Sequence, residues 1–483
     1  MNRKQPEILL YALTGLLIFV YVTIRVFTIP VTIDEAWTLY SFVRHPVWDI
    51  VTIKNPSTNN HILNTLLTKL TTVFSEKEFF LRLPNLLSLA GYIYGSYLLA
   101  KHLFSNRWLA LAMFLTLLTH FTLLDFFGLC RGYGLSIGLL MLSVAYLVKI
   151  AKDSTPPRPE HVHIILLTAT AAFYANIAVL HVMAAIILIT SFILYRRRNS
   201  KSTLTVLRLP IIYALVIGVL GGLKVWKQYE GGEIFYGGGN NFVDDTLAGM
   251  MPDYTGYTFF AEHGIWIMNI AVALLVLSVL IHLVFIRTQK LYLFIPFAIL
   301  IFSLLMTNIQ FYLLDVPLPV NRIALFFFPL MVLTIFTSLH ILAGYIKPLA
   351  ISIGVLLAMF GLWRFGSEMN FTKMNLWWMD MYAEQLVKDI AEDYSGPGKA
   401  RVFANWPTDN SVNYYINIYH NDKLVESPCC TRFSDLKSID SFDYIYMHAS
   451  DDENAFPGMT EINTYHVDGS LILYRNDGKL PKQ

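Results

Sequence analysis

The sequence predicts a mainly α-helical, polytopic membrane protein with a small α/β domain at its C-terminal end. Of its 483 residues, 55% are hydrophobic and 14% are charged, and the mean hydropathy is +0.50. Soluble domains carry roughly 25% charged residues, so this composition excludes an ordinary soluble protein. The net charge of +2 is too small to favour nucleic acid as a partner. The adjacent Cys429 and Cys430 are interpreted as two inert thiols, with a vicinal disulfide as the alternative.

Long apolar runs predict about eleven transmembrane helices, because a helix of about 20 apolar residues crosses the hydrocarbon core of a bilayer. The first run, in "MNRKQPEILLYALTGLLIFVYVTIRVFTIP", is long for a signal peptide and lacks a small-residue cleavage site, so we expect a retained helix. The expected spans are 7–29, 83–101, 108–127, 132–149, 162–176, 178–195, 207–226, 264–286, 291–312, 322–343 and 346–364.

Basic residues gather in alternate loops, and loops rich in Lys and Arg stay in the cytoplasm. The basic segments are "NRK", "KHLFSNR", "KIAKDSTPPRPEHVH", "RRRNSKSTLTVLR" and "RTQK". The first loop, residues 30–82, and the C-terminal chain are therefore expected on the periplasmic or extracellular side of a plasma (inner) membrane. On that side a glycine-rich loop, with three glycines at 237–239, is interpreted as a mobile cover over an outer cavity.

The hydropathy falls after residue 366, which predicts a transmembrane domain over 1–366 and a small α/β extracytoplasmic domain over 367–483. In the second domain "LWWMDMYAEQLVKDIAEDY" has helical periodicity and ends at the breaker "SGPG". "ARVFANW", "FDYIYMHAS" and "GSLILYRND" predict strands. "DNSVNYYINIYHND" predicts a helix with Asp409 or Asn410 as its N-cap.

Two adjacent acids follow the first span in "TIDEAWTLY", residues 32–40. Thr32 and Glu35 match a capping box, in which the two side chains bind each other's backbone amides. Because Thr32 already caps the helix, Asp34 has no required structural task and is a candidate general base. Glu35 stays a second catalytic candidate beside its capping role. Amphipathic segments, "DEAWTLYSFVRHPVWDIV" and "NNHILNTLLTKLTTVF", are expected to lie in the membrane interface around these acids.

The acidic pair, the structured first loop and three further segments resemble the GT-C superfamily of membrane glycosyltransferases. The segments are "FFLRLPNLL", "CRGYGLSIGLL" and "NRIALFFFPL". More narrowly, they resemble glycosyltransferase family 39, the branch of protein O-mannosyltransferases and lipid A aminoarabinose transferases. The resemblance is densest over residues 30–146 and weaker over 319–332. The chain departs from the family where Asp125 lies further than usual before Arg131, and where "NNHILNTLL" replaces the usual His-Pro-Pro or Lys-Pro-Pro segment.

The resemblance implies transfer of a sugar from a polyprenyl-phosphate donor to an acceptor hydroxyl, with inversion and with Asp34 as the general base. Cations would stabilise the leaving phosphate. The implied donor-phosphate residues are Arg131, Arg82, Arg322 and Tyr133. The implied acceptor or cavity residues are His61, Asn60, Tyr174 and His181. Participation of a divalent metal cation is left open, with Glu35 and His61 as its candidate ligands.

Structural roles are the alternatives for several of these residues. Arg82 and Arg322 can extend from helix ends to lipid headgroups, and Tyr133 can belong to an aromatic belt. His61 can be an ordinary interfacial histidine, and Tyr174 and His181 can be packing residues. The sequence does not identify the sugar, nor whether the acceptor is a glycan, a lipid or a protein.

Other functions also stay open. A lipid-linked oligosaccharide polymerase or ligase is the alternative within enzymes. A transporter or flippase of lipid-linked sugars is the alternative outside them, but it should show internal repeats and charges near the bilayer midplane. A scaffold that presents the C-terminal domain would not explain the amphipathic first loop.

Overall fold

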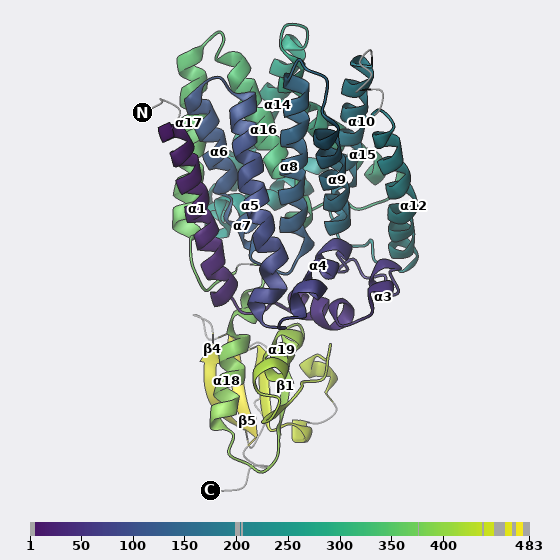
Figure 1. Ribbon diagram of the computed structural model, residues 1–483. Helices are drawn as coiled ribbons and strands as arrows, with labels where there is room; N and C mark the ends of the chain where they lie inside the picture. The colour runs from purple at the N-terminus through teal and green to yellow at the C-terminus, as the bar shows by residue number, and fades with distance from the viewer. Residues whose placement is uncertain are drawn as a thin grey trace. The chain divides into compact units, whose positions relative to one another are not determined.

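The computed structural model describes most of the chain (Figure 1). The described residues are 5–198, 203, 206–374, 376–436, 439–448, 459–465 and 470–476. Part of the basic evidence for orientation, at residues 2–4, 199–202 and 204–205, lies outside them.

The chain packs into two compact units. The one that we call the membrane unit comprises Met1–Thr23, Val47–Leu67 and Arg82–Met369. The other, the sheet unit, comprises Ile24–Pro46, Thr68–Leu81 and Asn370–Gln483. Parts of the first loop therefore pack with the C-terminal chain. The division into a catalytic domain over 1–366 and a separate domain over 367–483 stays a prediction.

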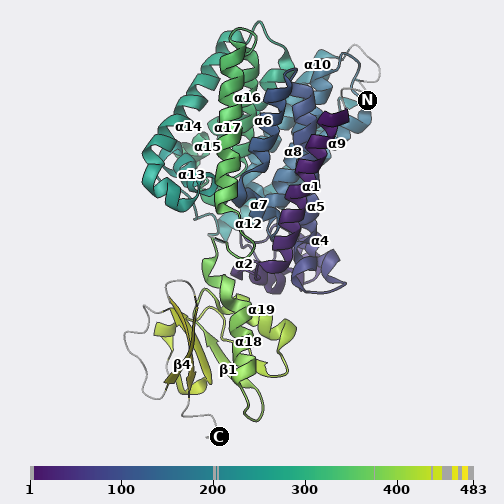
Figure 2. The ribbon, with the colours of Figure 1, turned by 90° about the vertical axis from the view of Figure 1, so that its left-hand side faces the viewer.

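Helices lie in all eleven ranges that the sequence predicts as spans (Figures 1 and 2). They are α1 (Gln5–Thr28), α5 (Glu78–Leu103), α6 (Arg107–Leu118), α7 (Phe121–Phe127), α8 (Gly132–Lys152), α9 (Pro159–Ala175), α10 (Leu180–Arg196), α12 (Leu209–Glu230), α14 (Tyr257–Phe285), α15 (Ile295–Leu314), α16 (Phe327–Leu342) and α17 (Lys347–Glu368). In the described part of the chain, seven helices are long and apolar enough to cross a membrane, or eight if α6 and α7 form one span. The protein is therefore polytopic, and the count of eleven stays a prediction because α5, α9 and α16 are not among these helices.

The range of the predicted span 108–127 holds two helices, α6 and α7, rather than one continuous helix. α6 and α7 are bent by 64° at the break between them. His120 causes the new start, because its Nδ1 accepts a hydrogen bond from the backbone amide of Leu123 at 3.2 Å. A side chain that caps a helix start satisfies amides that lack an intrahelical partner. The bend directs the chain toward the start of α8.

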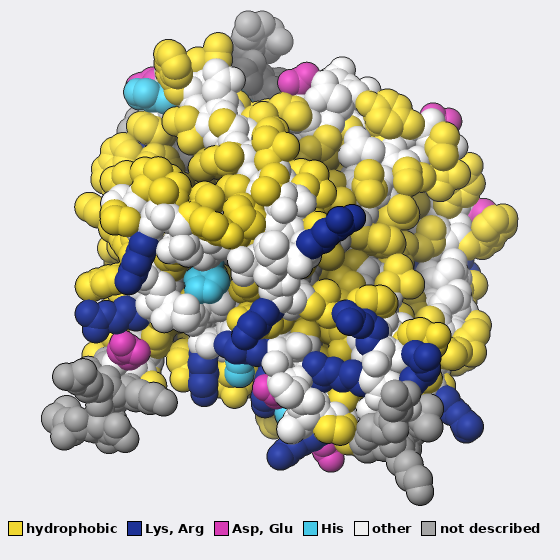
Figure 3. Space-filling model, turned by 90° about the horizontal axis from the view of Figure 1, so that it is seen from above, with side chains coloured by type: hydrophobic (Ala, Val, Ile, Leu, Met, Phe, Trp, Pro, Cys, Tyr) yellow, Lys and Arg dark blue, Asp and Glu magenta, His cyan; other side chains and the backbone are white. Residues whose placement is uncertain are grey.

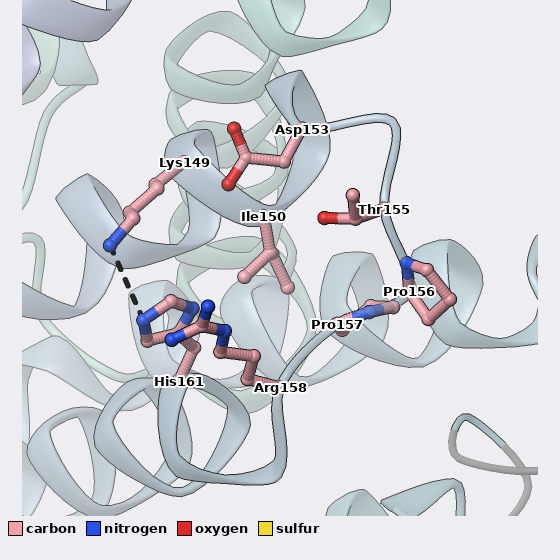
Figure 4. Close-up of a pocket in the computed structure, with 8 residues that line it drawn as sticks. All are labelled: Lys149, Ile150, Asp153, Thr155, Pro156, Pro157, Arg158 and His161. Carbon is pink, nitrogen blue, oxygen red and sulfur yellow. Dashed lines mark hydrogen bonds between the residues drawn. The ribbon is translucent and has the colours of Figure 1, made fainter.

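Basic side chains gather at the end of the membrane unit where α8 stops (Figure 3). There Lys152 donates to the carbonyl of His102 at 2.6 Å, and Arg197 donates to that of Ile150 at 2.8 Å. The same end holds a pocket of about 210 Å³ (Figure 4). The pocket is lined by Lys149, Ile150, Asp153, Thr155, Pro156, Pro157, Arg158 and His161. It lies about 30 Å along α8 from Arg131, at 1.5 Å per residue, so it is separate from the candidate residues of the sequence.

The sheet unit contains a five-stranded sheet with the strand order β2-β1-β3-β5-β4. Its elements are α18 (Ala383–Asp393), β1 (Ala400–Ala404), α19 (Asp409–Tyr419), β2 (Leu424–Val425), β3 (Tyr444–His448), β4 (Met459–Tyr465) and β5 (Leu471–Asn476). β1 is parallel to β2 and β3, whereas β5 is antiparallel to β3 and β4. The three predicted strands are confirmed, and α18 and α19 lie on one face of the sheet (Figure 2).

The N-cap predicted for α19 is wrong. Thr408 occupies the N-cap position, without a hydrogen bond from its side chain to the helix amides. Asp409 is the first helical residue, and its Oδ2 instead accepts from the backbone amide of Cys430 at 2.5 Å. Asp409 therefore binds the backbone at Cys430 instead of capping α19, and the local sequence pattern did not indicate Cys430 as its partner.

The first loop forms short helices within both segments that the sequence identifies as amphipathic. They are α2 (Ile33–Thr38), the π-helix η1 (Leu39–Val43), α3 (Val47–Val51) and α4 (Ile62–Thr72). α2 and η1 belong to the sheet unit, and α3 belongs to the membrane unit.

The triple-glycine loop is paired with another segment of the membrane unit. The amide of Gly238 donates to the carbonyl of Leu318 at 2.8 Å, and the amide of Leu318 donates back at 3.0 Å. A Cβ on Gly238 would lie 2.3 Å from the Cβ of Asp245, so glycine is required for this approach. The expected mobility of the loop stays a prediction.

Candidate active site

The acidic pair lies at the start of α2 in the sheet unit, and its capping box is confirmed. Thr32 Oγ1 accepts from the amide of Glu35 at 3.4 Å, and Glu35 Oε2 accepts from the amide of Thr32 at 3.1 Å. Glu35 is fully buried. The box engages Thr32 and Glu35, so it requires no carboxylate from Asp34.

A third acid, Asp380, lies beside this pair and was missed from the sequence. It belongs to the 3₁₀-helix η6 (Trp378–Tyr382). Its Oδ2 accepts from the amide of Ile33 at 2.8 Å, and its Oδ1 accepts from Ser411 Oγ at 2.7 Å. Burial, together with the negative charges of Asp34 and Glu35, raises the pKa of Asp380 to about 7 against the lowering effect of its two hydrogen bonds. A lone acid in the aromatic run "LWWMDMY" was the available signal.

In the membrane unit, Arg131 and His61 lie together at the start of α8. Arg131 is the N-cap residue of α8, is 2% exposed, and donates to the side-chain carbonyl of Asn59. The His61 ring lies 5.1 Å from the ring of Tyr133, centroid to centroid. Gly132 permits this packing, because a Cβ there would lie 2.7 Å from His61 Cγ.

Three cations act on the buried ring of His61. Burial lowers its pKa well below the ordinary value of 6.5, and the charges of Arg131, Lys224 and Arg322 lower it further. A hydrogen bond to the backbone of Ala175 opposes these effects. His61 is therefore held neutral in a strongly positive environment. We call Arg131, Lys224 and Arg322 the cation cluster.

Lys224 was missed because it lies inside a predicted span. It is 1% exposed on α12, and its Nζ donates to the carbonyl of Asn60 at 3.3 Å. Charged side chains within transmembrane segments are costly and commonly functional. The lysine in "GGLKVWKQYE" was therefore a usable signal.

The other two arginine candidates differ in exposure. Arg82 is fully buried on α5, which excludes an extended position among lipid headgroups. Arg322 is partly buried in η5 (Asn321–Ala324), and its guanidinium carbon lies 5.4 Å from the ring centroid of Tyr236. Arg322 therefore belongs to the cation cluster, whereas the role of Arg82 stays a prediction.

A buried acid accompanies Arg322. Asp253 lies on α13 (Ala248–Thr255) and accepts from Tyr257 Oη at 2.8 Å. Burial, together with the charge of Asp125, raises its pKa to about 7 against the lowering effects of the hydrogen bond from Tyr257 and the charge of Arg322. Neither the motifs nor the periodicity indicated this residue.

The remaining cavity candidates have packing contacts. The side chain of Asn60 donates to the carbonyl of Ile50 and accepts from Thr65 Oγ1, both at 3.3 Å. Tyr174 packs on a buried isoleucine cluster of the first loop, and its buried hydroxyl has no hydrogen-bond partner among the described residues. His181 lies 3.3 Å from a threonine hydroxyl of α15. These contacts favour structural roles for Asn60 and His181.

The two candidate metal ligands, Glu35 and His61, lie in different units. Among the residues that the structure describes, the potential ligand atoms that lie within 4.8 Å of one another belong to Asp409, Cys429 and Cys430. Both cysteines of this group are free thiols. A metal bound by Glu35 or His61 stays a prediction.

Comparison with known proteins shows a likeness of fold. No protein-family model and no curated protein sequence matches the chain. A crystal structure of ArnT from Cupriavidus metallidurans in the apo state matches with a TM-score of 0.56 and 9% identity, over 100% of both chains. A crystal structure of the same protein bound to undecaprenyl phosphate matches with a TM-score of 0.53 and 11% identity, over 99% of both chains. The chain therefore has an ArnT-like fold over nearly its whole length.

Proposed function

We propose that this protein is a membrane glycosyltransferase of the GT-C type that uses a polyprenyl-phosphate-linked sugar. The cation cluster carries the proposal, because the buried side chains of Arg131 and Lys224 donate to Asn59 and to the carbonyl of Asn60, directly before His61. The charge of Arg322 acts on the same buried ring. Arginine suits phosphate because its planar fork can bind two oxygens. The start of α8 at Arg131 adds the positive end of a helix dipole. The fold of the solved ArnT, which has been crystallised with undecaprenyl phosphate, agrees with this ligand class.

The proposed reaction is a displacement at the anomeric carbon with inversion. Asp34 takes the proton of the acceptor hydroxyl as its oxygen bonds to that carbon. The bond from the carbon to the phosphate oxygen breaks, and the lipid phosphate leaves with the electron pair. The cation cluster and Arg82 stabilise the charge that develops on the phosphate, with Tyr133 beside them. Glu35 positions Asp34 through the capping box.

The narrower proposal places the protein in glycosyltransferase family 39, in an inner membrane. The acceptor is a glycan, a lipid or a protein, and a divalent cation at Glu35 or His61 belongs to this proposal as an open element. Binding of the donor phosphate is proposed at the end of the membrane unit opposite the basic face of Figure 3, because basic loops stay in the cytoplasm. A transporter would instead place its charged site near the bilayer midplane.

The test uses purified protein, a panel of radiolabelled polyprenyl-phosphate sugars and membrane extracts as acceptors. We expect Asp34→Asn to lower transfer by about 100-fold or more, because general-base catalysis contributes about 10² to 10⁴. Donor binding should be unchanged. Asp49→Asn is the matched control, since Asp49 is an acid of the same loop that pairs with Lys54 at 3.0 Å. Full transfer by Asp34→Asn, or no transfer by the wild type from any donor, would contradict the proposal.

Orientation has its own test, which the glycine loop makes possible. A Cβ on Gly239 would have open space around it, whereas one on Gly237 or Gly238 would clash. We expect Gly239→Cys, with Cys429 and Cys430 replaced by serine, to react with an impermeant maleimide added outside intact cells. Thr155→Cys, in the pocket at the basic end, is the control that should react only after permeabilisation. The reverse pattern would overturn the orientation.

A further inference from the structure

We propose that Asp380 and Tyr415, both from the C-terminal chain, are positioning residues that hold the helix carrying Asp34. This inference rests on the proposed function, because it assigns to Asp34 the catalytic role described above. It gives the C-terminal chain a task in the reaction without placing any of its residues on the substrate.

The backbone amides at the start of α2 are held by side chains. The amide of Val31 donates to Tyr415 Oη at 2.8 Å, and the amide of Ile33 donates to Asp380 Oδ2 at 2.8 Å. The amides of Thr32 and Glu35 are bound within the capping box. The first amides of a helix have no intrahelical partner. For Ile33, the first residue of α2, this partner comes from a residue 347 positions away, and the amide of Val31, just before the N-cap, is bound by a residue 384 positions away.

The two holding side chains are themselves fixed. Asp380 is 2% exposed, and Ser411 Oγ on α19 donates to its Oδ1 at 2.7 Å. Tyr415, also on α19, is 1% exposed, and its ring lies 5.2 Å from that of Tyr414. A buried carboxylate with both oxygens bonded has one orientation available. The acceptors for the amides of α2 are therefore preorganised.

The same face of α19 continues along the chain after α2. Asn417 Nδ2 donates to the hydroxyl of Tyr40 on η1 at 3.0 Å. Tyr414 Oη donates to the carbonyl of Glu76 at 2.8 Å. α19 thus contacts the start of α2, the following π-helix and the segment before α5.

α2 depends on these contacts because it is short. It has six residues and continues directly into the five residues of η1, whereas isolated helices shorter than about 12–15 residues are marginal in water. Misplacement of a catalytic group by about 1 Å can lower a rate by about 100-fold. Loss of the Asp380 acceptor should therefore act on the rate of the chemical step and leave donor binding intact.

The test compares four variants of the full-length protein by steady-state kinetics. We expect Asp380→Ala to lower kcat by about 100-fold with the donor KM unchanged, and Tyr415→Phe to lower it by about 10-fold. Asp380→Asn should restore most of the rate, because its amide oxygen can accept from Ile33 and its amide nitrogen can donate to Ser411. Asp443→Ala is the matched control, since Asp443 accepts from the amide of Arg401 at 2.7 Å elsewhere in the sheet unit. It should retain the wild-type kcat.

Two kinetic results would overturn the inference. One is an Asp380→Asn variant as slow as Asp380→Ala, which would assign the effect to the carboxylate charge. The other is an Asp380→Ala variant with the same kinetics as Asp443→Ala.

Hydrogen exchange separates this inference from the proposed function, because it needs no activity. Amides of the peptide covering 31–38 should exchange at least about 10-fold faster in Asp380→Ala than in the wild type or in Asp443→Ala. If the wild type transfers no sugar but exchange is faster in Asp380→Ala, the positioning role of Asp380 is supported and the proposed glycosyltransferase function is contradicted. If exchange is unchanged in Asp380→Ala, Asp380 does not hold the start of α2, even if the protein transfers sugar.

Discussion

The two units differ in the sign of the charge that each gathers. The membrane unit holds the cation cluster around His61. The sheet unit holds Asp34, Glu35 and Asp380, and the first two raise the pKa of the third. A lipid phosphate needs cations, and an acceptor hydroxyl needs a base. Each unit by itself therefore carries the charge that suits one half of the proposed reaction, cations for the leaving phosphate and an acid for the acceptor hydroxyl.

Removal of a cation should have the largest effect on donor binding. We expect Arg131→Ala to weaken binding of undecaprenyl phosphate by about 100-fold, since hydrogen bonds to charged groups contribute about 1.5–3 kcal/mol. Lys224→Met should weaken it by about 10-fold, because Lys acts as a point charge. Binding is measured with labelled lipid phosphate in detergent, which separates donor binding from transfer.

A matched substitution controls for changes in the membrane unit. Arg131→Lys should weaken binding because the planar fork is lost. Arg364→Lys should not, because Arg364 is paired with Glu368 at 2.5 Å and lysine can keep that pair. Equal losses in the two lysine variants would contradict a specific phosphate role for Arg131, and so would an equal loss in Asp34→Asn.

The parts of this arrangement that depend on local sequence could be predicted. The capping box of Thr32 and Glu35 spans four residues and requires only its own backbone. The helices of the membrane unit follow from continuous apolar runs. Arg131 was identified from a short motif, and the structure places it at the N-cap of α8.

The parts of the arrangement that depend on contacts between distant residues could not be predicted from the sequence. Asp380 bonds the amide of Ile33, which is 347 residues away, and no periodicity encodes such a pair. Asp409 looked like an N-cap because its sequence neighbours fit one, but the amide of Cys430 uses it. The break before α7 was also missed, because histidine is not among the residues that usually mark a helix start.

The buried acid of the membrane unit, Asp253, affects stability rather than donor binding, and it sharpens the contrast between the units. Asp253 lies in the field of Arg322 and would weaken the cation cluster if it were ionised. Its pKa in the folded protein is about 7, above the ordinary 3.8. Between pH 4 and pH 7 the folded state therefore holds a proton that the unfolded state has released. The contribution of this group to stability falls as pH rises through that window, by at most about 1.4 kcal/mol per pH unit.

Asp253→Asn should remove this dependence, because the amide stays neutral at every pH. We expect the Tm of the variant minus that of the wild type to rise between pH 5 and pH 7 and then to level off. Asp245→Asn is the control: hydrogen bonds from Asn240 lower the pKa of Asp245, so it is ionised throughout this range and its Tm difference should be constant. A Tm difference for Asp253→Asn that is equally constant would mean that Asp253 is ionised in the folded protein. The membrane unit would then carry an acid that offsets Arg322, and the separation of charge between the units would be weaker than proposed.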